Sequence, residues 1–297
     1  MFTTLVAVIV ALVLGHLVPA AIGAIRNYHW YGDWVRWLDA RTGVAAVWRG
    51  RYGAALAVLP VVALVALLQW ALHGRLFGLP ALCFGVLVLV LCWGPRDLDR
   101  DVEAVIDADD ATARRAAVAH LQAAGGSVHA DVASLAEATL FNAMRRWFAP
   151  MFWFLLLGPL GAVLYRLLAL VAEGPFAALL PTDSRRGAGT ALALLEWPVA
   201  QLMVLSMALA GNFDTVFTAW RTAEGGRWAL SSGFLGAVGK ASVGAELRAE
   251  ADEYRQVGMV PADLPLPELR DAMSLIWRML LLWLVVLALL IIAGWVS

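Results

Sequence analysis

The sequence has few charged residues and a single lysine, and both scarcities exclude classes of protein. Charged residues make up 15% of the 297 residues, whereas soluble domains contain about 25%. The one lysine, Lys240, does not lie in a Gly-rich Gly-Lys-Ser/Thr motif, so a phosphate-loop nucleotide site is excluded. The net charge of −1 gives no indication of nucleic acid as a partner.

Cysteine and histidine are also scarce. Cys83 and Cys92 lie nine positions apart in one apolar run, too far apart on a helix to pair, and they are interpreted as small apolar residues. The five histidines are scattered, and no His/Cys cluster has the spacing of a metal site. The sequence therefore predicts neither a metal nor a cofactor.

Hydrophobic residues make up 62% of the chain, and the mean hydropathy is +0.75. A helix needs about 20 apolar residues to cross the hydrocarbon core of a bilayer. Six runs of about that length are present, at 3–24, 54–72, 78–94, 148–171, 191–211 and 276–296. The first lacks a basic leading region and is interpreted as a retained span, not a signal peptide. We expect an all-α polytopic protein with one membrane domain over 1–297. Run 191–211 is interrupted, so a re-entrant path remains open for it.

Arginine and lysine alternate between the gaps that separate these runs. Gap 25–53 carries five, and gaps 95–147 and 212–275 carry six each. The intervening gaps carry one (Arg75) and two (Arg185 and Arg186). Cytoplasmic loops retain Lys and Arg. The alternation predicts that the three rich gaps are cytoplasmic, and that gap 172–190 and both termini lie on the other side.

The cytoplasmic gaps contain helices of their own. Within 25–53, the residues Tyr28, Tyr31, Trp34, Val35 and Leu38 recur at helical spacing. They predict an amphipathic helix on the inner leaflet, with docking of a partner as the alternative. Gaps 95–147 and 212–275 have the composition of soluble helices. The small-residue segment 228–242 either dips into the membrane or packs on the bundle.

Of the ionisable residues that lie within spans, Arg166 and Glu196 stand out because both lie near the outer leaflet on this topology. Arg166 and Glu196 are expected either to pair with each other or to extend separately towards the interface. Pro159 and Pro198 free backbone carbonyls beside them. We predict a pocket for an unknown small molecule, formed by Arg166 and Glu196 with Tyr165, Pro159, Trp197 and Gln201.

A charged run opens gap 95–147 and offers a second candidate surface. It contains Arg96, Asp97, Asp99, Arg100 and Glu103. A scaffold that docks a cytoplasmic protein would use this face.

Three strings carry a family resemblance. They are Gly94-Pro95-Arg96-Asp97-Leu98-Asp99, the run 146–167, and Leu195-Glu196-Trp197-Pro198-Val199. They resemble the AmpE family of bacterial inner-membrane proteins, which is linked to β-lactamase induction and cell-wall recycling. The resemblance implies an inner-membrane location and a non-enzymatic role as a signalling modulator. In an inner membrane, the termini that the charge alternation places outside are periplasmic.

The AmpE family is itself distantly similar to the CbiB/CobD membrane enzymes, which join an aminopropanol phosphate to a corrinoid acid in cobalamin synthesis. The shared piece is Gly158-Pro159, Gly161-Ala162 and Tyr165-Arg166. An Asn-Thr-Leu-Asp-Ser-Met signature of those enzymes is replaced here by 167–171, and their Pro-Ala-Arg element ends in Gln201. These departures argue against corrinoid amidation. The alternative function is therefore a membrane enzyme or binder for a phosphorylated or peptidoglycan-derived small molecule in a retained cleft.

Overall fold

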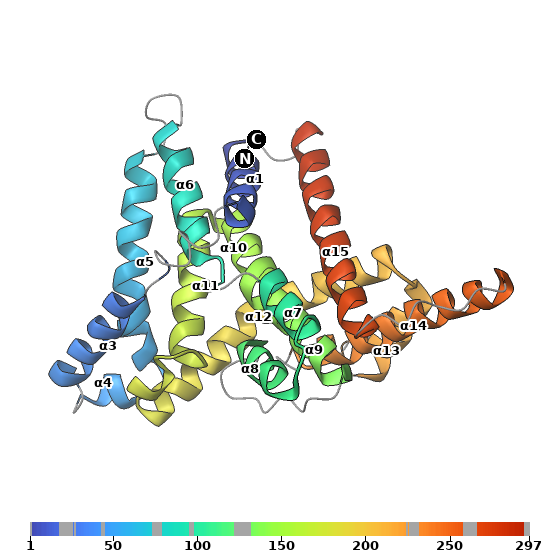
Figure 1. Ribbon diagram of the computed structural model, residues 1–297. Helices are drawn as coiled ribbons and strands as arrows, with labels where there is room; N and C mark the ends of the chain where they lie inside the picture. Colours follow the sequence, from blue (N-terminus) through green and yellow to red (C-terminus); the bar gives the residue numbers. More distant parts are fainter. Residues whose placement is uncertain are drawn as a thin grey trace. The chain divides into compact units, whose positions relative to one another are not determined.

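The computed structural model describes residues 2–17, 26, 28–42, 45–72, 79–94, 98–121, 132–223, 225, 232–257 and 266–293 (Figure 1). Every regular element in these ranges is a helix, which confirms the predicted all-α class. The helices are α1 (Phe2–Leu17), α3 (His29–Thr42), α4 (Ala46–Arg49), α5 (Gly53–Leu72), α6 (Leu79–Cys92), α7 (Leu98–Ile106), α8 (Ala111–Leu121), α9 (Val132–Ala143), η2 (Met144–Phe148), α10 (Ala149–Leu157), α11 (Pro159–Ala172), η3 (Ala177–Leu179), α12 (Thr182–Ala210), α13 (Phe213–Thr222), α14 (Phe234–Val257) and α15 (Pro267–Ile292).

The apolar helices have the character of a membrane protein. By length and composition α5, α12 and α15 can cross a bilayer, and α1, α6 and α11 are shorter apolar helices. Large apolar side chains point outward on the long helices, such as Leu67 of α5 and Leu289 of α15. Hydrocarbon, unlike water, solvates such side chains well. Run 191–211 forms the continuous second part of α12, without a break at Pro198.

The chain divides into two compact units. The first comprises 1–97, 146–196 and 290–297, and the second comprises 98–145 and 197–289.

The segment 148–171, predicted as one span, is a helical hairpin in the first unit. Helix α10 ends at Leu157, and Gly158 takes φ 72° and ψ −157°, a backbone conformation that is essentially restricted to glycine. The chain then reverses into α11, and the two helices diverge from this apex in Figure 1. With 9 and 14 residues, neither helix is long enough to cross a bilayer.

The contacts of the hairpin give its direction. At the start of α10, the carbonyl of Arg146 accepts a hydrogen bond from the Gly94 amide, just past the end of α6. At the apex, Leu157 and Leu160 contact Gln69, near the end of α5. Helix α10 therefore runs antiparallel to α6, and α11 returns antiparallel to α5.

As a result, the two ends of the hairpin lie at the same end of the first unit. Phe176, which follows α11, packs edge-on against Tyr31 of α3, with ring centroids 6.0 Å apart. A Cβ on Gly187 would meet the carbonyl of Arg51. Segment 173–187 thus lies beside gap 25–53. The prediction that gaps 172–190 and 25–53 lie on opposite sides of the membrane is wrong. The hairpin over 148–171 starts and ends on the same side, so it does not carry the chain across the bilayer.

Helices α3 and α4 occupy the amphipathic stretch of gap 25–53. Tyr31, Val35 and Leu38 are buried, whereas Trp30 and Trp37 are half exposed. The helix is fixed to its surroundings by the Trp34 indole, which donates to the carbonyl of Ala57 at 3.1 Å. Its position on the inner leaflet stays a prediction.

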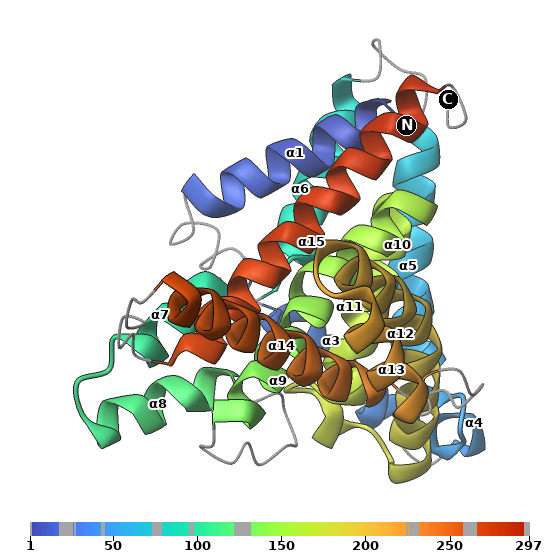
Figure 2. The same ribbon diagram turned by 90° about the vertical axis from the view of Figure 1, so that its right-hand side faces the viewer.

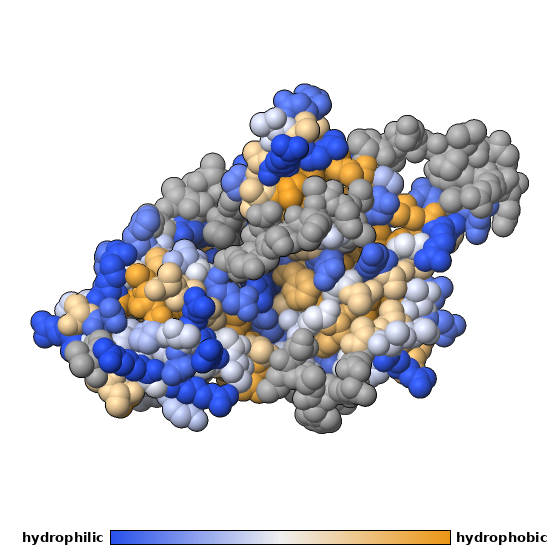
Figure 3. All heavy atoms as spheres, turned by 90° about the horizontal axis from the view of Figure 1, so that it is seen from below, coloured by the Kyte–Doolittle hydropathy of each residue, from blue (hydrophilic) through white to orange (hydrophobic). Residues whose placement is uncertain are grey.

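The second unit is built on helix pairs. Asp110 caps α8 by accepting from the amides of Thr112 and Ala113 at 2.8 and 2.6 Å. Figure 2 shows α14 lying across α9 and α13. Residues 234–242 of segment 228–242 belong to α14, where Gly239 packs against Leu140 of α9. Seen from below, the described residues on this face of the molecule are partly hydrophilic and partly apolar (Figure 3).

Candidate functional site

Two side chains from the segment before α3 donate hydrogen bonds to backbone carbonyls at the C-terminal end of α6. Arg26 donates from Nε to the Val90 carbonyl at 2.9 Å and from Nη1 to the Gly94 carbonyl at 2.6 Å. The Tyr28 hydroxyl donates to the Leu91 carbonyl at 2.6 Å. The last carbonyls of a helix have no partner within the helix. These contacts supply partners for them and bring a cation to the helix end, where the helix dipole favours it.

Arg166 of α11 lies beside this helix end. It is 8% exposed, and its guanidinium carbon lies 5.5 Å from the centre of the Tyr28 ring. Its Nε is buried and has no hydrogen-bond partner among the described residues. A buried polar atom without a partner costs free energy, and more so when the group is charged. The Nε–H of Arg166 is thus a hydrogen-bond donor without a described partner beside the C-terminal end of α6.

A cavity of about 210 Å³ opens at this place. Its lining is apolar apart from Arg166, Tyr28 and Cys92, and consists of Tyr28, Trp30, Val61, Val65, Val88, Leu91, Cys92, Val163, Arg166 and Leu167. A cavity of this size with one cation and aromatic walls suits an anionic group attached to a small apolar body.

The protonation of Tyr28 follows from its surroundings. Burial raises the pKa of its hydroxyl above the usual value, while the nearby Arg166 and Arg26 oppose this shift without cancelling it. At neutral pH Tyr28 is therefore a neutral donor to Leu91. Because Tyr28 carries no negative charge, it does not neutralise the positive charges of Arg26 and Arg166.

Glu196 lies against a different residue from the one expected. The Tyr165 hydroxyl donates to Glu196 Oε1 at 3.2 Å, and both residues are buried. Successive helical residues point in directions about 100° apart. Arg166 therefore points towards Tyr28, whereas the neighbouring Tyr165 points towards Glu196. In the described residues the ion pair expected between Arg166 and Glu196 is replaced by these two contacts.

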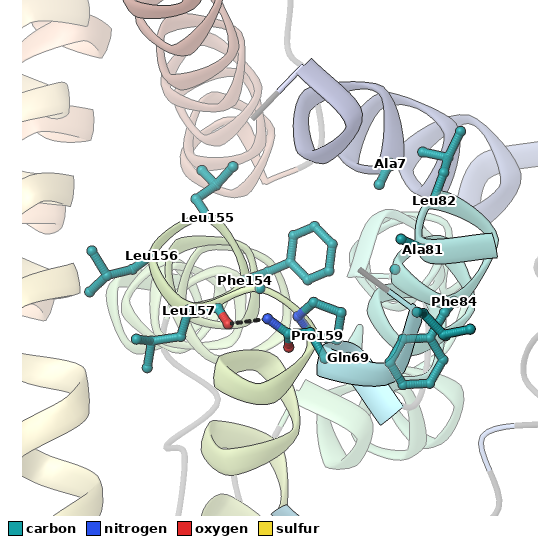
Figure 4. A pocket seen from close by; sticks show the side chains of 13 residues that line it. Ala7, Gln69, Ala81, Leu82, Phe84, Phe154, Leu155, Leu156, Leu157 and Pro159 are labelled. Carbon is teal, nitrogen blue, oxygen red and sulfur yellow. Dashed lines mark hydrogen bonds between the residues drawn. The ribbon is translucent and has the colours of Figure 1, made fainter. Parts of the chain in front are cut away.

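A second cavity of about 350 Å³ lies at the hairpin apex, and Pro159 lines it. Figure 4 shows Gln69 reaching across the break between α10 and α11. Its Nε2 donates to the Leu157 carbonyl at 3.2 Å, and its Oε1 accepts from the Leu160 amide at 3.1 Å. The other side chains in view are mostly apolar, Phe84 and Phe154 among them.

The remaining predicted pocket residues, Trp197 and Gln201, belong to the second unit. Gln201 accepts from the Trp220 indole at 3.0 Å and donates to the Gly225 carbonyl at 2.8 Å. The predicted set is thus distributed over four surroundings: Arg166 at one cavity, Pro159 at the other, Tyr165 against Glu196, and Gln201 between α12 and α13. Its role as one pocket stays a prediction.

The candidate docking face is described in part. Arg96 and Asp97 lie outside the described residues. Asp99 accepts a hydrogen bond from the Trp277 indole of α15 at 3.1 Å, so it is engaged within the second unit. Arg100 and Glu103 are exposed on α7. The docking of a partner here stays a prediction.

Sequence reasoning missed Arg26, Gln69 and the role of Tyr28. Arg26 entered only as one of the charges in its gap, and Tyr28 only as a member of an apolar face. Gln69 is the one carboxamide in the apolar run 54–72. A polar side chain in such a run usually has a partner, and this is the signal that would have identified it.

Comparison with known proteins identifies relatives of the chain. The family described as CobD/CbiB protein matches residues 4–251. The cobalamin biosynthesis protein CobD of Chromobacterium violaceum is 30% identical over 230 residues, which cover 73% of this chain and 71% of that protein. No solved structure matches the chain.

These matches correct the expected function. The assignment to the AmpE family is not supported, and the prediction of a non-enzymatic modulator of β-lactamase induction is wrong, because the family and the relative both point to cobalamin biosynthesis. The shared residues around Gly158, Tyr165 and Arg166 resemble both families, so the strings alone favoured the wrong one. The chain belongs to the CobD/CbiB family.

Proposed function

We propose that this chain is a membrane enzyme of cobalamin biosynthesis that binds a phosphorylated small molecule in the cavity beside Arg166. The observation that supports this most directly is the buried Arg166 side chain, whose Nε has no hydrogen-bond partner among the described residues and whose guanidinium borders an apolar cavity. The name of the Chromobacterium relative and the family match support the biosynthetic role.

Guanidinium chemistry suits this ligand class. The planar fork of an arginine matches the oxygens of a phosphate, and charge-assisted hydrogen bonds are about twice as strong as neutral ones. The apolar walls keep water away and strengthen the attraction. Arg26, held at the end of α6, adds positive charge near Tyr28, which lines the cavity. An aminopropanol phosphate, which the CbiB/CobD resemblance implies, has the required phosphate on a short three-carbon body that also carries an amine.

The corrinoid half of that reaction finds less support in this chain. The position that matches the arginine of the Pro-Ala-Arg element holds Gln201, and both ends of its carboxamide are occupied by Trp220 and Gly225. The site thus supports recognition of the phosphate more strongly than recognition of the corrinoid, and we derive no bond-forming step from it.

Binding to purified protein in nanodiscs tests the proposal. We expect calorimetry to detect 1-amino-2-propanol phosphate, and to detect 1-amino-2-propanol without phosphate far more weakly. Arg166→Gln should weaken phosphate binding by roughly 10- to 100-fold, because a charged hydrogen bond contributes about 1.5–3 kcal/mol. Arg186→Gln is the matched control, since the Arg186 side chain is 76% exposed and bonds to Asp183, three positions earlier on the same helix. Wild-type affinity in the Arg166→Gln variant would overturn the site.

Growth tests the biosynthetic role separately. In a cobalamin-requiring strain that lacks its own CobD/CbiB protein, we expect this chain to restore cobalamin-dependent growth and the Arg166→Gln variant not to restore it. Absence of growth with a well-accumulated wild-type chain would contradict the role in cobalamin biosynthesis, whereas the calorimetry would still report on the phosphate site.

A further inference from the structure

Helix α13 carries three aromatic rings in a row on its surface. Phe213, Phe217 and Trp220 form this aromatic stripe at helical spacing. The rings of Phe213 and Phe217 stack with centroids 5.7 Å apart, and those of Phe217 and Trp220 with centroids 5.6 Å apart. Phe213 is 53% exposed and Phe217 is 44% exposed. Nothing in the described part of the second unit covers these two rings.

The other faces of α13 have different surroundings. Val216 is fully buried, on the side where α13 packs against α14. Asp214, Thr218 and Arg221 are exposed. The helix therefore has an inner face, a polar face, and the aromatic stripe between them. A helix with one aromatic and one polar surface is typical of a bilayer interface, where rings lie at the level of the lipid headgroups.

The preceding helix, α12, also has an exposed apolar surface. Leu202, Leu205 and Leu209 of α12 are exposed and fall on one side of that helix. Only Gly211 and Asn212 separate the end of α12 from the start of α13. The three Cα–Cα steps from Ala210 to Phe213 extend over about 11 Å at most. Helix α13 therefore begins close to the end of α12.

Hydrogen bonds fix α13 in this position. The Trp220 indole donates to Gln201 of α12, which in turn donates to the Gly225 carbonyl beyond the end of α13. A Cβ on Gly225 would overlap the Trp220 ring, so this turn is closed against the indole. The indole N–H of Trp220 thus has a partner within the protein, and the rest of its ring belongs to the aromatic stripe.

We propose that α13 lies in the headgroup region of the bilayer, with the aromatic stripe facing the acyl chains. The occupant of this face is lipid, because only two residues separate α13 from α12, a helix long and apolar enough to cross a bilayer, and the stripe is too close to that helix to leave the membrane surface. The Arg221 guanidinium lies 5.9 Å from the Phe217 ring centre and is exposed. It is placed to meet anionic headgroups beside the rings.

Spin labels at neighbouring positions of α13 test this placement. The background is the Cys83→Ala/Cys92→Ala chain in nanodiscs of phosphatidylcholine and phosphatidylglycerol, with labels introduced by Phe217→Cys or by Thr218→Cys. We expect the label at position 217 to collide more with oxygen than with a water-soluble nickel complex, and the label at 218 to show the opposite preference. Phe213→Cys is a second reporter of the stripe if the variant at 217 does not accumulate.

Each other outcome contradicts the proposal. Nickel accessibility at 213 and 217 equal to that at 218 would place the stripe in water. Exclusion of both reagents from 213 and 217 would show that protein covers it, either a partner or a second copy of the chain. The inference does not depend on the Arg166 site, so failure of either proposal leaves the other standing.

Discussion

Gln69 closes the polar gap that the chain reversal at Gly158 opens. Its carboxamide bonds to the carbonyl before the glycine and to an amide after it, and a Cβ on Gly158 would lie 2.8 Å from Gln69 Nε2. Within hydrocarbon, each backbone group without a partner costs several kcal/mol. The hairpin is therefore a joint product of two residues that are 89 positions apart in sequence.

Replacement of Gly158 should be costly. Gly158→Ala forces a side chain into a backbone conformation that only glycine adopts readily and pushes against Gln69, so we expect a loss of about 1–3 kcal/mol. Thermal unfolding in detergent, followed by the monodisperse fraction on gel filtration, measures the change. Gly189→Ala is the control, because a Cβ there meets nothing within 4 Å and α12 is helical. Equal melting temperatures for the two variants would contradict the reversal.

The hairpin also predicts the sides on which loops are accessible. Single cysteines from Thr182→Cys and Tyr52→Cys should react with a membrane-impermeant maleimide from the same side of sealed vesicles, because segment 173–187 lies beside gap 25–53. Arg75→Cys, in the gap between α5 and α6, should react from the opposite side. Labelling of positions 182 and 75 from the same side would contradict the hairpin and support a single membrane-crossing span over 148–171.

Alkaline pH should destabilise the protein through Tyr28. Burial raises the pKa of its hydroxyl above the unfolded value of about 10, so the folded state favours the neutral phenol. This contribution to stability is complete below pH ~10 and is lost as the pH rises through the folded-state pKa. We expect unfolding midpoints to fall above pH ~10 in the wild type and to fall less steeply in Tyr28→Phe.

The matched control for this pH effect is Tyr52→Phe, because Tyr52 is 78% exposed. It should keep the wild-type dependence on pH. Burial also raises the pKa of Tyr31, so the variant with both Tyr28→Phe and Tyr31→Phe should show the flattest profile. A pH profile of Tyr28→Phe identical to that of the wild type would contradict the assigned environment.

Several features of the fold were predictable from local pattern alone. Apolar runs of sufficient length predicted the helices at 54–72 and 276–296. The spacing of Tyr31, Val35 and Leu38 predicted the buried face of α3. These predictions succeeded because the hydrophobic period acts over one or two turns.

The candidate site was only partly predictable. Arg166 stood out as a cation in an apolar run, and it borders a cavity. Its neighbours Arg26 and Tyr28 come from a segment about 140 positions earlier, and no local pattern links them to α11. The family was also misassigned from sequence strings, because the same glycines and aromatics resemble two related families and only the comparison over most of the chain separated them.

The sequence by itself determined that this is an all-helical membrane protein with an ionisable residue in an apolar setting, since composition and period suffice for that. Only the tertiary structure decided that segment 148–171 reverses at Gly158. It also decided that Arg166 lies against Tyr28 while Tyr165 donates to Glu196, and that α13 exposes its aromatic rings. A run of apolar residues has the same hydropathy whether it crosses a bilayer or turns back. The choice depends on one glycine conformation and on a distant glutamine that satisfies the exposed backbone.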